Sequence, residues 1–276
     1  MARRKILVCG GGNGAHCCAA LTALLPNTQV RVLTLYGDEA SRWQQISETN
    51  NGINLTIVKG DGKEETFKSN LSMITNDPKA ALDDINIIFI VVPAFAHEQY
   101  LTALAPHLQP NTIIIGMPGQ AGFEFQCRHI LGSKVPQTAI VNFESLPWAC
   151  RILEFGKHVK MLGCKETLGA SLITGSQCKL PFKAFDEIQI ILGEEPKIRV
   201  IQNYIAITLM TDSRLCMVKW GKWDGTPLPE KPLFYQGIDE IQAEYLTKAS
   251  DEMMNYSQGN REAETRCEND RCHPYF

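Results

Sequence analysis

KILVCGGGNGA, residues 5–15, joins a short apolar run directly to a cluster of glycines. The apolar run is typical of a buried parallel strand. Residues 15–25 are rich in alanine and leucine and end before Pro26, a pattern that predicts a helix. Residues 29–36 are apolar and β-branched and predict a second strand, which completes a βαβ unit.

The glycine cluster has the spacing and the position of a nucleotide-binding loop. Gly10, Gly12 and Ala15 match the pattern G-x-G-x-x-G/A between a strand and a helix. Gly10 permits the tight turn, Gly12 lets backbone amides approach a pyrophosphate, and Ala15 keeps helix and strand close. The motif alone is a weak signal, but here the flanking elements stand in the required order. We therefore expect a nicotinamide dinucleotide to bind at Gly10, Gly11, Gly12, Asn13, Gly14 and Ala15.

The end of the second strand leaves the choice between NAD and NADP open. An acidic residue normally stands there and binds the adenosine ribose. Here residues 34–36 are Thr, Leu and Tyr, and the first acids are Asp38 and Glu39. Arg42 is near enough in sequence to favour a 2′-phosphate, although an exposed arginine on a helix is the simpler interpretation.

Buried strands and helices alternate as far as about residue 155. We expect strands at 85–92, 112–116 and 139–143, and helices at 78–82, 98–105 and 123–130. Residues 53–58 and 64–68 flank Asp61-Gly62 and predict a hairpin added to the core. The alternation predicts an α/β protein with a doubly wound parallel Rossmann sheet.

The pattern weakens in the second half of the chain. Residues 159–162 and 171–173 predict short strands, and residues 186–192 and 198–210 predict helices. After Ala249 the composition turns polar, which is typical of a disordered or poorly packed tail. We expect a Rossmann domain over residues 1–200 and a partial, mainly helical domain over residues 201–276.

The bulk composition excludes several classes of protein. The 276 residues are 44% hydrophobic and 21% charged, with a net charge of −3, so no basic surface for nucleic acid or membranes is indicated. The longest apolar run, 85–96, is too short to span a bilayer, and residues 1–9 do not form a signal peptide. The ten cysteines have no CxxC or zinc spacing, so we expect no metal site and reduced thiols in the cytoplasm.

Three of the predicted strands end in unusual residues, and ligands bind at such ends in open α/β sheets. The stretches are VPAFAH (92–97), MPGQAGF (117–123) and FESLPWACR (143–151). A glutamine and a glutamate at this edge suit a polar or cationic substrate. Glu144 can pair with a guanidinium or ammonium group, or it can be an ordinary loop-capping residue. For His97 and His16 we expect structural roles rather than catalytic ones.

These stretches resemble the opine dehydrogenases. The match runs from Lys5 to about Arg151 and resumes at KWGKWDG (219–225) and PLFYQGID (232–239). The resemblance implies NADH-dependent reductive condensation of pyruvate with an amino acid, in which hydride reduces an imine. It implies that residues 10–15 hold the pyrophosphate, that Pro93, Ala94 and Phe95 border the nicotinamide ribose, and that Gln120, Glu144 and Ser145 face the substrates. The family has threonine at the position of Ser145.

Two features depart from the family pattern. The family has a catalytic histidine, followed by proline, shortly before the Trp-Gly-x-Trp string, but that position falls here at about Asp212, followed by Ser213. No histidine occurs between His158 and His273. An aspartate with an ordinary pKa of about 3.9 is ionised and cannot donate a proton without strong desolvation. We also expect the family's large second domain to be shortened in this chain, and no catalytic residue is assigned.

Three functional hypotheses remain. The first is an NAD-dependent opine dehydrogenase. The second is a nucleotide-binding relative with little or no turnover, which the absent histidine and the short second half favour. The third is another dehydrogenase of the same superfamily, acting on a hydroxy acid or a glycerol phosphate, which the stretch FESLPWACR argues against. The amino acid used and the oligomeric state stay open.

Overall fold

The structure is a computed structural model that describes residues 4–120, 122–201, 226, 239–245, 247–248 and 251. The chain divides into two compact units, residues 1–208 and residues 209–276. The division that we predict from the sequence, at residue 200, stays a prediction. The first unit contains the sheets and the candidate site.

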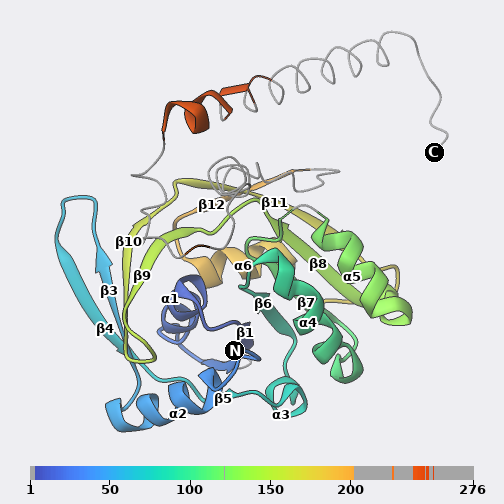
Figure 1. Cartoon of the computed structure of the whole chain (residues 1–276). Coiled ribbons are helices and arrows are strands. Elements are labelled where there is room, and N and C mark those ends of the chain that lie inside the picture. The colour runs from blue at the N-terminus through green and yellow to red at the C-terminus, as the bar shows by residue number, and fades with distance from the viewer. Residues whose placement is uncertain are drawn as a thin grey trace. The chain divides into compact units, whose positions relative to one another are not determined.

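An eight-stranded sheet forms the centre of the first unit (Figure 1). Its strands, in spatial order, are β12 (Lys197–Val200), β11 (Thr167–Thr174), β8 (Thr138–Phe143), β7 (Thr112–Gly116), β6 (Ile87–Ile90), β1 (Arg4–Cys9), β2 (Thr28–Leu33) and β5 (Met73–Thr75). Neighbours pair in parallel, except that β11 is antiparallel to β8. From β5 to β8 the order is that of a doubly wound Rossmann sheet. The predicted α/β class is confirmed, with the sheet mixed rather than purely parallel.

Helices cover both faces of this sheet because successive side chains of each strand point to opposite sides. In β1, Ile6 and Val8 pack in one buried cluster and Leu7 and Cys9 in the other. The first cluster includes α1 (Asn13–Thr22), α6 (Ala184–Leu192) and Trp43 of α2 (Glu39–Asn50). The second includes α3 (Pro78–Leu82), α4 (Ala94–Leu104) and α5 (Phe123–Leu131). Two short 3₁₀ helices complete the unit, η1 (Ala105–His107) and η2 (Gly132–Gln137).

A second sheet of four strands lies beyond α1. Its order is β4 (Glu64–Ser69), β3 (Ile53–Val58), β10 (His158–Cys164) and β9 (Trp148–Glu154). The predicted hairpin is confirmed, since β3 and β4 pair antiparallel, but it belongs to this sheet through the parallel pairing of β3 with β10. Helix α1 contacts strands of both sheets and is buried nearly all round, which explains its alanines and cysteines.

The structure corrects the sequence expectations at several boundaries. Helix α4 begins at Ala94, four residues before the expected start at Glu98. The expected helix over residues 198–210 is wrong at its start, because residues 197–200 form β12 and pair with β11. The four residues KIRV make an exposed edge strand that a short window does not distinguish from a helix. Residues 202–210 lie outside the described part of the chain.

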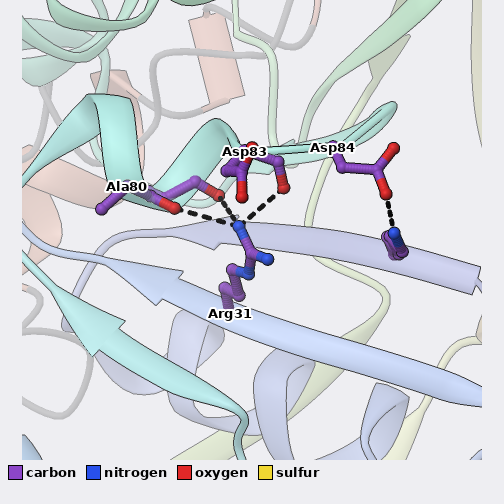
Figure 2. A network of polar contacts seen from close by, with 6 residues as sticks. Arg31, Ala80, Asp83 and Asp84 are labelled. Atoms are coloured by element: carbon purple, nitrogen blue, oxygen red, sulfur yellow. Dashed lines mark hydrogen bonds and ion pairs between the residues drawn. The ribbon is translucent and has the colours of Figure 1, made fainter.

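Arg31 in β2 is a buried cation that binds the end of helix α3 (Figure 2). Its Nη1 donates to the carbonyl oxygens of Ala80 at 2.9 Å, Ala81 at 3.3 Å and Asp83 at 2.7 Å. The last carbonyls of a helix have no partner within the helix and carry partial negative charge. Arg31 therefore supplies the hydrogen-bond donors that the end of α3 lacks. The ion pair of Lys5 and Asp84 lies next to it.

We expect Arg31→Met to lower the free energy of unfolding by about 2 to 4 kcal/mol, because it leaves three carbonyls without their charged donor. Urea denaturation measures this loss. The matched control is Arg128→Met, which changes an exposed arginine of α5 and should cost less than about 0.5 kcal/mol. Equal losses in the two variants would contradict the role given to Arg31.

The described residues of the second unit include a helical segment from Glu240. Asp239 and Gln242 cap it reciprocally: the Gln242 amide donates to Asp239 Oδ1 at 2.8 Å, and the Asp239 amide donates to Gln242 Oε1 at 3.1 Å. Across the described ranges, none of the helices has the length and apolar character needed to cross a membrane.

Candidate functional site

At the junction of β1 and α1, Gly10 has no room for a side chain, whereas Gly12 faces open space. Gly10 has φ of 123°, and a β-carbon on it would lie 2.5 Å from the Val91 carbonyl oxygen, so only glycine fits. Gly12 is the N-cap of α1, and a β-carbon there would meet no atom within 4 Å. The first turn of a helix has amides without a partner inside the helix, and here this turn borders open space, which is the arrangement that binds an anion.

The next residues of the loop pack against other elements. Asn13 Oδ1 accepts from the Ile152 amide at 2.8 Å, so the Asn13 side chain is engaged with β9. A β-carbon on Gly14 would lie 3.0 Å from Leu146 Cδ2, so glycine lets the loop after β8 approach the helix. Ala15 is fully buried against Gly10. The side-chain oxygen of Asn13 is therefore already engaged within the protein.

His16 fixes the carbonyl group of Gly12. Its Nδ1 lies 3.1 Å from the Gly12 oxygen, and its Nε2 lies 3.0 Å from the Gly156 amide nitrogen. A carbonyl can only accept and an amide can only donate, so the ring is neutral with its proton on Nδ1. The ring is stacked on Trp43 with a centroid distance of 3.7 Å, and burial lowers the pKa of His16 to about 4. His16 thus ties the glycine loop to the turn between β9 and β10.

The loops after β6 and β7 meet at the same edge of the sheet. Pro93 is the N-cap of α4, Ala94 begins the helix, and Phe95 is 88% exposed. The Ala94 amide donates to Gln120 Oε1 at 3.1 Å, and Gln120 has φ of 60°. The structure therefore brings together residues that we singled out in two separate sequence stretches.

A buried polar pair supports the loop that carries Gln120. Asn142 Nδ2 donates to Glu124 Oε2 at 3.0 Å, and both side chains are buried. The Asn142 side chain packs directly on Gly119, where any β-carbon would collide with it. The Gly119 amide also donates to the Phe143 carbonyl at 3.0 Å. The loop after β7 is thereby fastened to β8, one residue before Gln120.

The loop after β8 presents a carboxylate and a hydroxyl beside two cations. Glu144 Oε1 accepts from the Gly169 amide at 2.8 Å, and Arg199 Nη2 lies 4.0 Å from Glu144 Oε2. Ser145 Oγ accepts a hydrogen bond from Lys165 Nζ. Neither Lys165 nor Arg199 was singled out from the sequence, because both belong to no motif and lie far along the chain from residues 144–145.

Other candidates from the sequence have different outcomes. His97 is buried with its ring against Phe123 at 5.0 Å, and burial lowers its pKa to about 4, which fits a structural role. Asp212, Ser213 and the stretch 219–225 lie outside the described residues. In the part of the chain that the structure does describe, no three His, Cys, Asp or Glu side chains gather to hold a metal ion.

A doubly wound sheet, an open helix N-terminus after its first strand and polar loops after the next strands together define a Rossmann-type nucleotide-binding fold. No protein-family model matches the chain. Comparison with curated proteins, however, finds the opine dehydrogenase of Haliotis discus hannai, 47% identical over 256 residues, and the octopine dehydrogenase of Pecten maximus, 44% identical over 252 residues. Both alignments span 90% of this chain.

Solved structures agree with this result. Octopine dehydrogenase in complex with NADH and agmatine is similar with a TM-score of 0.77 and 42% identity, covering 91% of this chain and 63% of that one. Structures of octopine dehydrogenase with NADH and L-arginine, and with NADH and pyruvate, have TM-scores of 0.75 and 0.74. In sequence and in fold, this chain is therefore related to the opine dehydrogenases, and the resemblance is confirmed. The chain spans 62–63% of the length of the two curated relatives.

Proposed function

We propose that this chain binds NADH and catalyses the reductive condensation of pyruvate with an amino acid, as an opine dehydrogenase. The observation that carries the proposal is the open space at Gly12, at the N-terminus of α1. This space lies where a Rossmann domain holds a pyrophosphate, and no side chain of the described residues fills it. The similarity to structures solved with NADH, pyruvate and L-arginine supports the choice of ligands.

Each predicted site residue has a proposed role within this arrangement. Residues 10–15 bind the pyrophosphate through backbone amides, and residues 93–95 border the nicotinamide ribose. Bound NADH would supply the hydride. Gln120 orients the substrate from the loop after β7, where its side chain is held by the Ala94 amide.

The loop after β8 would contribute charge and polarity to substrate binding. Glu144 attracts an ammonium or guanidinium group of the amino acid, since charged hydrogen bonds are about twice as strong as neutral ones. The carboxylate of the 2-oxo acid has a matching donor pair in Ser145 and Lys165, which already lie in contact. The loop thus places the negative charge of Glu144 near the positive charge of Lys165, and the two substrates together carry a cationic group and a carboxylate.

A second candidate function is nucleotide binding with little or no turnover. It is favoured by the sequence at Asp212, the position at which we expect the family's histidine. An ionised carboxylate there cannot replace an imidazole that donates a proton near neutral pH. The two candidates share the cofactor site and differ only in chemistry.

One experiment separates these candidates. Purified full chain is first titrated with NADH in a calorimeter and is then mixed with NADH, pyruvate and a panel of amino acids while the absorbance of reduced nicotinamide is followed. The proposal expects binding followed by amino-acid-dependent loss of NADH. Binding without consumption would support the second candidate, and the absence of binding would overturn both.

We also propose a cytosolic location for the protein. Seven cysteines fall within the described ranges, and all are free thiols. Free thiols are typical of a reducing compartment. Fractionation of cells that express the chain would test this proposal, and recovery in a secreted or membrane fraction would contradict it.

A further inference from the structure

We propose that Glu39 selects NADH over NADPH, by accepting hydrogen bonds from the hydroxyls of the adenosine ribose. The inference rests on the proposed cofactor binding and deepens it, because it assigns cofactor specificity to one side chain. The sequence alone left this choice open, since β2 does not end in an acid.

Glu39 is the first residue of α2, six residues beyond the end of β2, yet its carboxylate returns to the strand end. Thr34 Oγ1 donates to Glu39 Oε2 at 2.6 Å, and Thr34 is only 1% exposed. The carboxylate also lies directly against Gly11: a β-carbon on that glycine would be 2.0 Å from Glu39 Oε2. A fixed carboxylate therefore borders the glycine loop, beside the open space at Gly12.

The hydrogen bond from Thr34 explains how Glu39 can reach the end of β2 although it does not belong to that strand. In many Rossmann domains an acidic side chain at the end of the second strand reaches the ribose directly. Here the strand end supplies a hydroxyl donor, and this donor holds a carboxylate that arrives from the next helix. The N-terminus of α2 carries partial positive charge, which favours a carboxylate in its first turn.

The neighbouring charged residues do not offer the same function. The Asp38 side chain is 76% exposed and lies 3.7 Å from Arg42 Nη1. The Arg42 guanidinium is placed 4.4 Å from the ring centre of Phe155, so it is held by an aromatic face and an acid of its own helix. The Glu39 carboxylate, by contrast, lies against Gly11 of the glycine loop.

The chemistry distinguishes the two cofactors at one atom. NADH has a 2′-hydroxyl on its adenosine ribose, which can donate to a carboxylate oxygen. NADPH has a dianionic phosphate at the same position, which cannot donate and is repelled by a like charge. A carboxylate next to the glycine loop therefore strengthens NADH binding by a hydrogen bond and weakens NADPH binding by charge repulsion.

The test compares Glu39→Gln with Asp38→Asn in the full chain, with NADH and NADPH binding measured by calorimetry. We expect Glu39→Gln to weaken NADH about tenfold and to strengthen NADPH about threefold, so that the preference falls about thirtyfold. Asp38→Asn removes an equal charge one residue away and should change both dissociation constants by less than about twofold. Thermal melts of both variants check that the fold is kept.

A further variant tests how Glu39 is held. Thr34→Val removes the donor and keeps the charge, so we expect NADH to bind about threefold more weakly, with no gain in NADPH binding. If wild type binds NADH but Glu39→Gln keeps the wild-type preference, the role of Glu39 is wrong and the proposed function stands. If wild type binds neither cofactor, both proposals fall.

Discussion

Gly12→Val abolishes NADH binding in our expectation, with a dissociation constant raised at least about a hundredfold, while the fold survives. Two charged hydrogen bonds from backbone amides to a pyrophosphate contribute more than about 3 kcal/mol, and about 1.4 kcal/mol corresponds to a factor of ten. A valine side chain would fill the open space at Gly12 and keep the pyrophosphate away from these amides. The expected effect is large because the valine side chain would displace the pyrophosphate from its binding position.

The stability of this variant should change little. Gly12 has φ of −85°, which any residue adopts, and no atom of the described residues lies within 4 Å of the added β-carbon. Valine is a poorer N-cap than glycine, which costs up to about 1 kcal/mol. Calorimetry with NADH and urea denaturation of the same preparation measure the two quantities separately.

Gly10→Ala is the matched control, because it should show the opposite behaviour. Its φ of 123° is unfavourable for alanine, and the new β-carbon would collide with the Val91 carbonyl oxygen. We expect a loss of about 3 kcal/mol in the free energy of unfolding. If Gly12→Val binds NADH as tightly as wild type, the cofactor does not lie at this junction.

The parts of the fold that could be predicted from the sequence are those with a strong local pattern. Strands β6 (IIFI) and β7 (TIIIG) are short, isoleucine-rich runs in which every residue is buried. Such a run is recognised as a buried strand from the local sequence alone. The sequence analysis expects Arg42 on a helix but gives no bounds for helix α2, because its sequence, EASRWQQISETN, buries only Ala40 and Trp43. Two buried side chains do not form the apolar stripe by which a helix is recognised in a sequence.

The second sheet could not be predicted because its pairing is not local. β3 pairs with β10, and Asn54 stands opposite His158, more than a hundred residues away in the chain. No window of sequence contains both strands, and β9 alternates only partly between buried and exposed residues. The hairpin β3–β4 was predictable because its two strands are joined by an Asp-Gly turn.

The candidate site divides in the same way. The glycine loop is a continuous motif, and the structure shows a close contact that requires glycine at Gly10 and open space at Gly12. Lys165 has no sequence signal, and the sequence names Glu39 only as one of the first two acids after the second strand. Their positions follow from hydrogen bonds with Thr34 and Ser145, which exist only once the elements are assembled.

Two buried histidines lead to the largest effect on stability that we expect, a loss on acidification. Burial lowers the pKa of His16 and of His97 from 6.5 to about 4, so the fold favours the neutral ring in both. In the unfolded chain each ring has an ordinary pKa and becomes protonated near pH 6.5. Each histidine therefore contributes stability that is complete above pH 6.5 and is lost as the pH falls towards 4.

The loss is about 3 kcal/mol for each histidine, since one unit of pKa corresponds to about 1.4 kcal/mol. Two such losses approach the whole stability of an ordinary domain, about 5 to 15 kcal/mol. We therefore expect the free energy of unfolding to fall by about 6 kcal/mol between pH 7 and pH 4, measured by urea denaturation at a series of pH values. For His16 the physical event is specific, because a protonated Nε2 can no longer accept from the Gly156 amide.

His97→Leu should remove about half of this pH dependence, because it deletes one of the two titrating rings while filling a similar buried volume against Phe123. The control is His129→Leu, which changes an exposed histidine of α5 and should leave the slope as in wild type. A pH dependence that is the same in all three proteins would show that acid acts on other groups. A reduced slope in His97→Leu alone would show that desolvation of buried imidazole rings sets the acid limit of this fold.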